Sequence, residues 1–129
     1  MSGGKAIIAV LDDEAKMRSA LRRLLGTHGY EVELFETGDE FLKAAQCHCP
    51  DCLLLDLHMP QTTGFDVLRA LARLEIQVPA IVITGHDEPG NAERLFELGA
   101  VDYLLKPLDE TLLVNAIERT CLTKGRPRS

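Results

Sequence analysis

The chain has 129 residues, of which 46% are hydrophobic and 26% charged, and its formal net charge is −6 at pH 7. This length and composition predict one globular domain with a proper core and exclude a disordered or fibrous protein. No apolar run approaches the roughly 18 residues of a membrane-spanning helix, the N-terminus lacks the features of a signal peptide, and the negative charge argues weakly against a nucleic-acid-binding surface. We therefore expect a cytoplasmic protein that contacts no membrane and binds no nucleic acid directly.

Four cysteines occur at positions 47, 49, 52 and 121, and the first three lie in the segment CHCPDC. Structural zinc sites pair their ligands as C-x2–4-C with a second pair further along the chain, and this chain lacks that spacing. Cys52 also begins an apolar run that predicts a buried strand. We interpret the cluster as small side chains of a turn and a strand start, and a disulfide is disfavoured in a reducing compartment.

Strand and helix signals alternate along the chain. The predicted strands cover residues 5–11, 31–36, 51–57, 78–84 and 101–105. The second alternates apolar and charged residues, which is typical of an edge strand, whereas the third and fourth are apolar on both faces and belong at the centre of a sheet. Strands that alternate with helices through short loops predict right-handed βαβ units and a parallel sheet covered on both faces.

Each predicted strand is followed by apolar residues at helical spacing. The first helix is expected to end at His28-Gly29, the second to begin at Thr37 in a capping box, and the last to be capped by Asp109. The residues expected to face the core are Met17, Leu21, Leu24, Leu25, Phe41, Leu42, Ala45, Phe65, Leu68, Ala72, Ala92, Leu95, Phe96, Leu112, Leu113, Ala116 and Ile117. Five such units favour an open doubly wound sheet over a barrel, which needs eight. The folded domain should span 5–121, followed by a basic tail or linker stub at 122–129.

Polar side chains collect where the predicted strands end. Asp12 and Asp13 follow the first strand, Asp56 ends the third, Thr84 ends the fourth and Lys106 follows the fifth. Open α/β sheets bind ligands outside the carboxyl ends of their strands, so all these groups can face one crevice. Taken singly, an aspartate can cap a helix, a threonine can bond to the backbone and a lysine can be solvated. Asp56 is harder to explain in that way, because it ends a strand that is apolar on both faces.

Three clustered carboxylates repel one another unless a cation neutralises them. A hard divalent ion such as Mg²⁺ suits an all-oxygen site that also takes a phosphate oxygen. One carboxylate can then act as the nucleophile that forms an aspartyl phosphate, while the ion, the lysine and the hydroxyl stabilise the transferring group. The set therefore indicates phosphoryl transfer.

At these residues the sequence resembles the receiver domains of two-component response regulators, over residues 5–121. The resemblance rests on VLDDE (10–14), LLLDLHMPQTTG (53–64), IVITGH (81–86) and GAVDYLLKP (99–107). It implies a flavodoxin-like three-layer sandwich of five parallel strands in the order 2-1-3-4-5 with five helices. Gly85 stands where many receivers have alanine, and the TGH run is similar to the nitrogen-fixation regulators, which often carry a C-terminal helix-turn-helix domain.

The resemblance also implies how the acidic residues act. Asp56 would accept a phosphoryl group from a histidine kinase or phosphotransfer protein. Asp13, Asp56 and the backbone carbonyl of His58 would ligate Mg²⁺, and Asp12 would help through water. On this basis the chain catalyses only its own phosphorylation and dephosphorylation.

Further residues are implied as the switch. Lys106 would pair with the phosphoryl group, and its bond to Pro107 is expected to be cis. Thr84 would bring its hydroxyl onto the phosphate, and Tyr103 would follow inward. The surface formed by the fourth helix, fifth strand and fifth helix would then change its preference for partners, and it is a candidate homodimer surface.

Three other classes of protein share part of this pattern. A haloacid-dehalogenase-like phosphatase also uses an aspartate nucleophile and Mg²⁺, but it requires a second aspartate where this chain has His58. A receiver-like interaction module that is never phosphorylated would be expected to lack Asp56, Lys106 or one of the other acidic residues, and none is missing. A flavin-binding domain would need a phosphate-cradling loop after the first strand, where LDDEAKM has the opposite charge.

Overall fold

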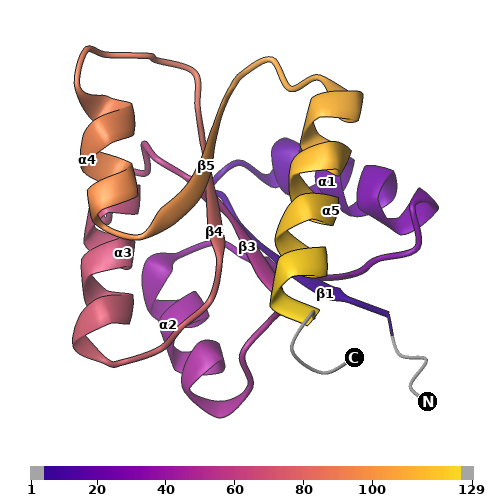
Figure 1. Ribbon diagram of the computed structural model, residues 1–129, viewed down its shortest axis with the longest axis horizontal. Coiled ribbons are helices and arrows are strands. Elements are labelled where there is room, and N and C mark those ends of the chain that lie inside the picture. Colours follow the sequence, from indigo (N-terminus) through magenta and orange to yellow (C-terminus); the bar gives the residue numbers. More distant parts are fainter. Residues whose placement is uncertain (1–4, 126–129) are drawn as a thin grey trace.

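The structure, a computed structural model, describes residues 5–125, with side chains described through Cys121. Five strands alternate with five helices along the chain (Figure 1). The elements are β1 (Ile7–Leu11), α1 (Ala15–Thr27), β2 (Glu31–Phe35), α2 (Gly38–Cys47), β3 (Cys52–Asp56), α3 (Gly64–Arg73), β4 (Ala80–Thr84), α4 (Asn91–Glu97), β5 (Ala100–Leu105) and α5 (Glu110–Gly125). All neighbouring strands pair in parallel, in the order β2-β1-β3-β4-β5. The predicted fold and strand order are confirmed.

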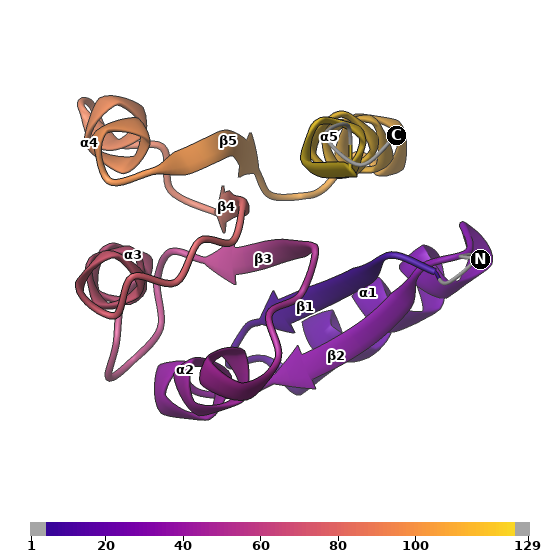
Figure 2. The ribbon, with the colours of Figure 1, turned by 60° about the horizontal axis from the view of Figure 1, so that its bottom comes forward.

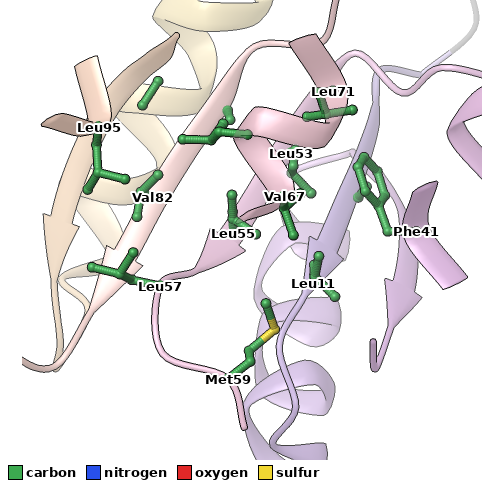
Figure 3. Packing of buried hydrophobic residues seen from close by; sticks show 14 of the residues in the cluster. Leu11, Phe41, Leu53, Leu55, Leu57, Met59, Val67, Leu71, Val82 and Leu95 are labelled. Carbon is green, nitrogen blue, oxygen red and sulfur yellow. The ribbon is translucent and has the colours of Figure 1, made fainter. Parts of the chain in front are cut away.

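The sheet separates two layers of helices. Helices α2, α3 and α4 cover one face and α1 and α5 cover the other, as the turned view shows (Figure 2). Alternate residues of β3 serve the two sides, because successive side chains of a strand point to opposite faces. Leu53 and Leu55 pack with Phe41 and Val67 beneath α2 and α3 (Figure 3). Cys52 and Leu54 belong to the second core cluster, which α1 and α5 close.

Burial along the strands agrees with their places in the sheet. Every residue of β3 and β4 is buried, as predicted for central strands with helices on both faces. In β2 no residue is fully buried, and in β5 only Ala100 is. These two strands are the edges of the sheet. No helix in the described part of the chain is long and apolar enough to cross a membrane.

Three residues that were expected to face the core are exposed instead. Phe96 of α4 is 47% exposed and Leu112 of α5 is 60% exposed, and Ala72 of α3 is also on the surface. The buried apolar side chains of these helices are Val67, Leu68, Ala70, Leu71, Leu95, Leu113, Val114, Ala116 and Ile117. A helix that packs on a sheet buries a stripe narrower than its run of apolar residues. Periodicity alone therefore assigned too many residues to the buried face.

Side-chain caps begin α2, α3 and α5. The Thr37 hydroxyl accepts the Glu40 N–H at 3.1 Å, but the Glu40 carboxylate accepts the N–H of Glu36 rather than that of Thr37, so the predicted capping box is only half formed. Asp109 accepts the Leu112 N–H at 3.0 Å, as predicted. Helix α5 continues to Gly125, so residues 122–125 of the predicted tail are helical, and residues 126–129 lie outside the described part.

Helix α3 ends in a Schellman motif that has glutamate where glycine is usual. The Ile76 N–H donates to the Leu71 carbonyl at 2.9 Å, and the Glu75 N–H donates to the Ala72 carbonyl at 3.1 Å. Glu75 must therefore adopt a left-handed conformation, with φ of 59°. A Cβ atom makes this conformation unfavourable, and glycine avoids the penalty.

We predict that Glu75→Gly raises the free energy of unfolding by about 0.5–1 kcal/mol, because the relief of left-handed strain exceeds the entropy that glycine adds to the unfolded chain. Urea denaturation measures the difference. The matched control is Glu118→Gly, the same change at an exposed position inside α5, which should lower stability by about 1 kcal/mol. A Glu75→Gly protein as unstable as the control would contradict the strain argument.

Candidate functional site

Three aspartates meet at the carboxyl end of the sheet. Asp12 and Asp13 follow β1, Asp56 is the last residue of β3, and one carboxylate oxygen from each lies within 4.8 Å of the others. Asp12 is 3% and Asp56 6% exposed, while Asp13 is exposed. Strands β1 and β3 are neighbours at the point where the chain order of the sheet reverses. This is the crevice in which doubly wound folds bind ligands.

Backbone contacts hold the two buried aspartates in place. The Glu14 N–H donates to Asp12 Oδ1 at 2.8 Å, and Arg18 Nη1 donates to the Asp12 carbonyl at 2.7 Å. The His58 N–H lies 3.4 Å from Asp56 Oδ1, which is a long hydrogen bond. The sequence pattern gave no sign of the Arg18 contact, because it depends on how α1 leaves the loop after β1.

Lys106 is the cation of the site. Its Nζ atom lies 3.6 Å from Asp12 Oδ2 and 3.7 Å from Asp56 Oδ1, so it bridges the two buried carboxylates. The backbone fixes the lysine, because its N–H donates to the Thr84 carbonyl at 2.8 Å and the Lys106–Pro107 peptide is cis. One ammonium therefore lies between the two buried members of a group of three carboxylates.

Burial makes the two aspartates Asp12 and Asp56 harder to ionise. Burial raises the pKa of Asp56 to about 7, the charge of Asp12 adds to the rise, and Lys106 opposes it. Burial also raises the pKa of Asp12, against the Glu14 hydrogen bond and Lys106. The ionised cluster is thus unfavourable with lysine as its counter-ion, and a divalent cation would relieve the repulsion. The donor set is all oxygen, which fits Mg²⁺.

The Thr84 side chain is tied to its own loop. It is fully buried, and its hydroxyl donates to the His86 carbonyl at 3.1 Å and accepts the His86 N–H at 3.0 Å. This local turn is the ordinary use of a threonine at a strand end. A part in phosphoryl binding would require the hydroxyl to leave the turn, so that role stays a prediction.

Tyr103 is anchored by a residue that sequence reasoning missed. Its ring packs against the core cluster under α2, α3 and α4, and its hydroxyl donates to Asp87 Oδ1 at 3.0 Å. Burial and the Asp87 hydrogen bond raise the pKa of the tyrosine, and the amide of Asn91 lowers it. Asn91 is buried at the start of α4, and its Nδ2 has no hydrogen-bond partner within the described part of the chain. The only sequence signal for this group is the polar run HDEPGN after β4.

Gly64 explains how the loop after β3 stays close to the site. Its N–H donates to the Leu57 carbonyl at 2.9 Å. A Cβ at this position would lie 3.1 Å from Leu57 Cα and 3.3 Å from the Asp56 carbonyl oxygen. Glycine therefore lets the first turn of α3 press against the end of β3, which fixes the backbone that carries Asp56.

The cysteines lie apart from this pocket. Cys52 begins β3, at the opposite end of the strand from Asp56, and Cys47 and Cys49 are exposed thiols at the end of α2. No disulfide joins any of the four. The aspartates are the one group of three or more metal-ligating side chains that lie close enough together among the residues described.

Fold and site together define a doubly wound α/β domain with an acidic, lysine-bridged pocket at its topological switch point. Residues 8–118 match the family model of the response regulator receiver domain. The chain therefore belongs to the response regulator receiver family, the phosphoacceptor domains of two-component signalling.

The relatives fit the predicted subgroup. The transcriptional regulatory protein FixJ of Rhizobium meliloti is 37% identical over 112 residues, which are 87% of this chain and 55% of FixJ. The response regulator protein TodT of Pseudomonas putida is 36% identical over 129 residues, 100% of this chain and 57% of TodT. The chain thus spans about half the length of the curated relatives it matches.

Solved structures show the same fold. The crystal structure of FixJ-N is 35% identical, with a TM-score of 0.84, over 92% of this chain and 94% of that one. The chemotaxis protein CheY4 of Vibrio cholerae is 28% identical, also with a TM-score of 0.84, over 91% of this chain and 99% of that one.

We predict that Asp56→Asn stabilises the metal-free protein in a pH-dependent way. The Asp56 pKa is about 7 when folded against 3.8 as the reference for an unfolded chain, so the folded state holds this proton more tightly. The carboxyl is neutral in both states below about pH 4, and its cost to stability grows as the pH rises to about 7 and is constant above. In EDTA, the variant should be roughly 1–3 kcal/mol more stable at about pH 8, and the difference should shrink steadily to near zero at about pH 4.

Urea denaturation at several pH values measures this difference. The control is Asp39→Asn, which removes an exposed carboxylate from the first turn of α2 and should leave the wild-type pH profile unchanged. If the free energies of unfolding of wild type and Asp56→Asn differ by the same amount at every pH, ionisation of Asp56 does not destabilise the folded protein.

Proposed function

We propose that Asp56 accepts a phosphoryl group from a histidine kinase or phosphotransfer protein, in the cytoplasm. A carboxylate oxygen bonds to phosphorus while the phosphorus–nitrogen bond of the donor phosphohistidine breaks. The observation that carries this proposal is the buried carboxylate at the end of β3, with Lys106 Nζ 3.7 Å away and two further carboxylates within 4.8 Å. The negative charge of these carboxylates would be balanced better once a cation binds beside them, and the cation and Lys106 could then bind a phosphoryl group.

The residues that would hold Mg²⁺ are Asp13, Asp56 and the His58 backbone carbonyl, with Asp12 acting through water. The all-oxygen donor set of the three aspartates supports this fit. The raised pKa values of Asp12 and Asp56, caused first by burial, also favour added positive charge at the site. When bound, the ion would neutralise charge on the transferring phosphoryl group. The acceptor Asp56 would itself be one of the ligands of this ion.

The chain's own residues then respond to the new anion. Lys106 would exchange the Asp56 carboxylate for phosphoryl oxygens, and the Thr84 hydroxyl would exchange His86 for the same group. Reversing an equilibrium from 1:99 to 99:1 takes about 5.5 kcal/mol, and two or three charge-assisted hydrogen bonds of roughly 1.5–3 kcal/mol each are of that size. Tyr103 would then move inward, because its hydrogen-bond partner Asp87 lies in the loop after β4 that moves with Thr84.

The output would be read on the surface of α4, β5 and α5. Among the side chains that the structure describes, four of the five large exposed apolar residues belong to these elements, namely Phe96, Val101, Leu105 and Leu112. Exposed apolar side chains on neighbouring elements favour a partner surface, including a second copy of the chain. The net charge of −6 supports the proposal that this chain itself does not contact nucleic acid.

Incubation with acetyl phosphate and Mg²⁺, followed by intact-mass spectrometry, tests the acceptor. We expect one phosphoryl adduct on the wild type, none on Asp56→Asn, and none after addition of EDTA before the donor. Asp39→Asn, which removes a surface carboxylate, should keep the adduct.

A folded wild type without an adduct would overturn the phosphoacceptor proposal in favour of an interaction module or a phosphatase, which a phosphatase-substrate screen would separate. An adduct that survives in Asp56→Asn would assign a different acceptor.

The hydrogen bond between Tyr103 and Asp87 leads to a prediction about the rate of phosphorylation. If it holds the tyrosine in the unphosphorylated arrangement, Asp87→Ala should speed adduct formation by about fivefold, which corresponds to about 1 kcal/mol for one such bond. Tyr103→Phe should act similarly, and the double variant should be no faster than either single one, because all three lose the same bond.

Rates from a mass-spectrometric time course complete this double-mutant cycle. Glu88→Ala removes a neighbouring charge of the same loop without touching the hydrogen bond, and its rate should stay at the wild-type value. Additive effects of the two single changes would show that the contact does not restrain the switch.

A further inference from the structure

A groove lies at the amino end of the sheet, at the opposite end of the strands from the acidic pocket. Its walls come from the end of α3, the loop before β4, the start of β5 and the second half of α5. Its volume is about 1110 Å³, slightly above the range of about 300–1,000 Å³ that is typical of small-molecule sites. The lining includes Leu71, Ala72, Glu75, Ile76, Val101 and Asp102. The phosphoacceptor role makes no use of this amino-end groove.

Most side chains that line the amino-end groove are apolar, and one of them sits at an irregularity of the sheet. Ala80 of β4 pairs with Ala100 of β5. The next residue, Ile81, pairs with Asp102, so Val101 has no partner in β4. Irregularities of this kind occur at sheet edges and beside binding sites, where they redirect a side chain. Here the valine is 48% exposed and lines the groove.

The fold does not explain why Glu75 has a side chain at all. Its backbone is left-handed, with φ of 59°, and glycine would adopt this conformation more easily. Within residues 5–121 its carboxylate takes part in no hydrogen bond or ion pair, and it is exposed at the rim of the groove. Unfavourable backbone conformations that bring no contact within the fold are found at functional positions, especially where ligands bind.

The charges of the groove favour a cation over an anion. Its lining has two carboxylates, Glu75 and Asp102, and one guanidinium, Arg119, which gives a net charge of −1. Arg119 Nη2 lies 3.0 Å from Asp102 Oδ2, and the other oxygen of this carboxylate accepts the Tyr103 N–H at 2.9 Å. An anionic ligand would therefore have to compete with Asp102 for the guanidinium. A cationic ligand would find the Glu75 carboxylate available.

We propose that the amino-end groove binds a small organic cation. Its apolar body would pack on Leu71, Ile76 and Val101, and its single ammonium group would lie beside the Glu75 carboxylate. The site does not depend on the proposed phosphorylation of Asp56, because the groove and the acidic pocket share no residue. For a compact ligand in an open groove we expect a dissociation constant in about the millimolar range.

Three probes that share one apolar body and differ in charge test this proposal. 4-Phenylbutylamine, 4-phenylbutanol and 4-phenylbutyrate are each titrated at pH 7 into the ¹⁵N-labelled chain, and the amide shifts are followed by NMR. We expect saturable shifts at residues of the groove such as Ile76 and Val101. The amine should bind about two- to fivefold more tightly than the alcohol, the range for one exposed ion pair, and the carboxylate should bind most weakly.

A charge variant separates the contribution of Glu75 from that of the apolar walls. Glu75→Gln keeps the size of the side chain, so the alcohol should bind as it does to wild type, whereas the preference for the amine should disappear. The matched control is Glu93→Gln, which removes an exposed carboxylate of α4 outside the groove and should keep that preference.

A second pair of variants tests the position of the apolar body. Ala72→Phe fills the groove from an exposed position on α3 and should prevent binding of all three probes. Ala20→Phe makes the same change at an exposed position on α1 and should leave binding unchanged. Circular dichroism confirms that each variant is folded.

Four results would overturn the proposal. These are a failure of the amine to saturate the groove amides, an alcohol or carboxylate that binds wild type as tightly as the amine, a Glu93→Gln protein that loses the amine preference as Glu75→Gln does, and an Ala72→Phe protein that binds like wild type. None of these results bears on whether Asp56 is phosphorylated.

Discussion

Burial of two carboxylates side by side at the ends of neighbouring strands is the constraint on which this domain depends. Asp12 and Asp56 lie at the ends of adjacent strands, nearly free of solvent, and share a single lysine. Ionised carboxylates in such a place are unfavourable unless further positive charge or hydrogen bonds reach them. The Glu14 N–H and the Lys106 ammonium supply part of this compensation. A divalent cation would supply more.

The buried carboxylates are linked by a short series of contacts to the loop after β4. The groups around the carboxylates connect through the backbone to the loop after β4, since Lys106 donates to the Thr84 carbonyl and the Thr84 hydroxyl is bonded to His86. The next residue, Asp87, holds the Tyr103 hydroxyl. A new anion at Asp56 would thus compete for partners that the loop is using. The surface of α4 and β5 lies at the other end of this short chain of contacts.

Sequence reasoning recovered the fold because periodicity, glycine stops and two-faced apolar strands all indicate the same alternation of elements. It located all five strands, and it placed each candidate site residue at the carboxyl end of its strand. It was wrong where a choice depended on neighbours in space. Phe96 and Leu112 are apolar residues at helical spacing, yet they face solvent, because α4 and α5 lie beside an edge strand that has no further partner. Asp87, Arg18 and Asn91 were missed as contacts of the site, since no spacing rule relates them to their partners.

The sequence by itself determined which groups this protein carries to the end of its sheet: three carboxylates, a threonine and a lysine, each at the end of a strand or just after it. That information is local, because a strand and the residue after it are consecutive in the chain. Only the tertiary structure decided the distances. The reversal of strand order beside β1 brings Asp12 and Asp56 under one ammonium, and the packing of the β4–α4 loop brings Tyr103 to Asp87. Electrostatic and hydrogen-bond energies fall steeply with distance, so the chemistry exists only once the fold has set those separations.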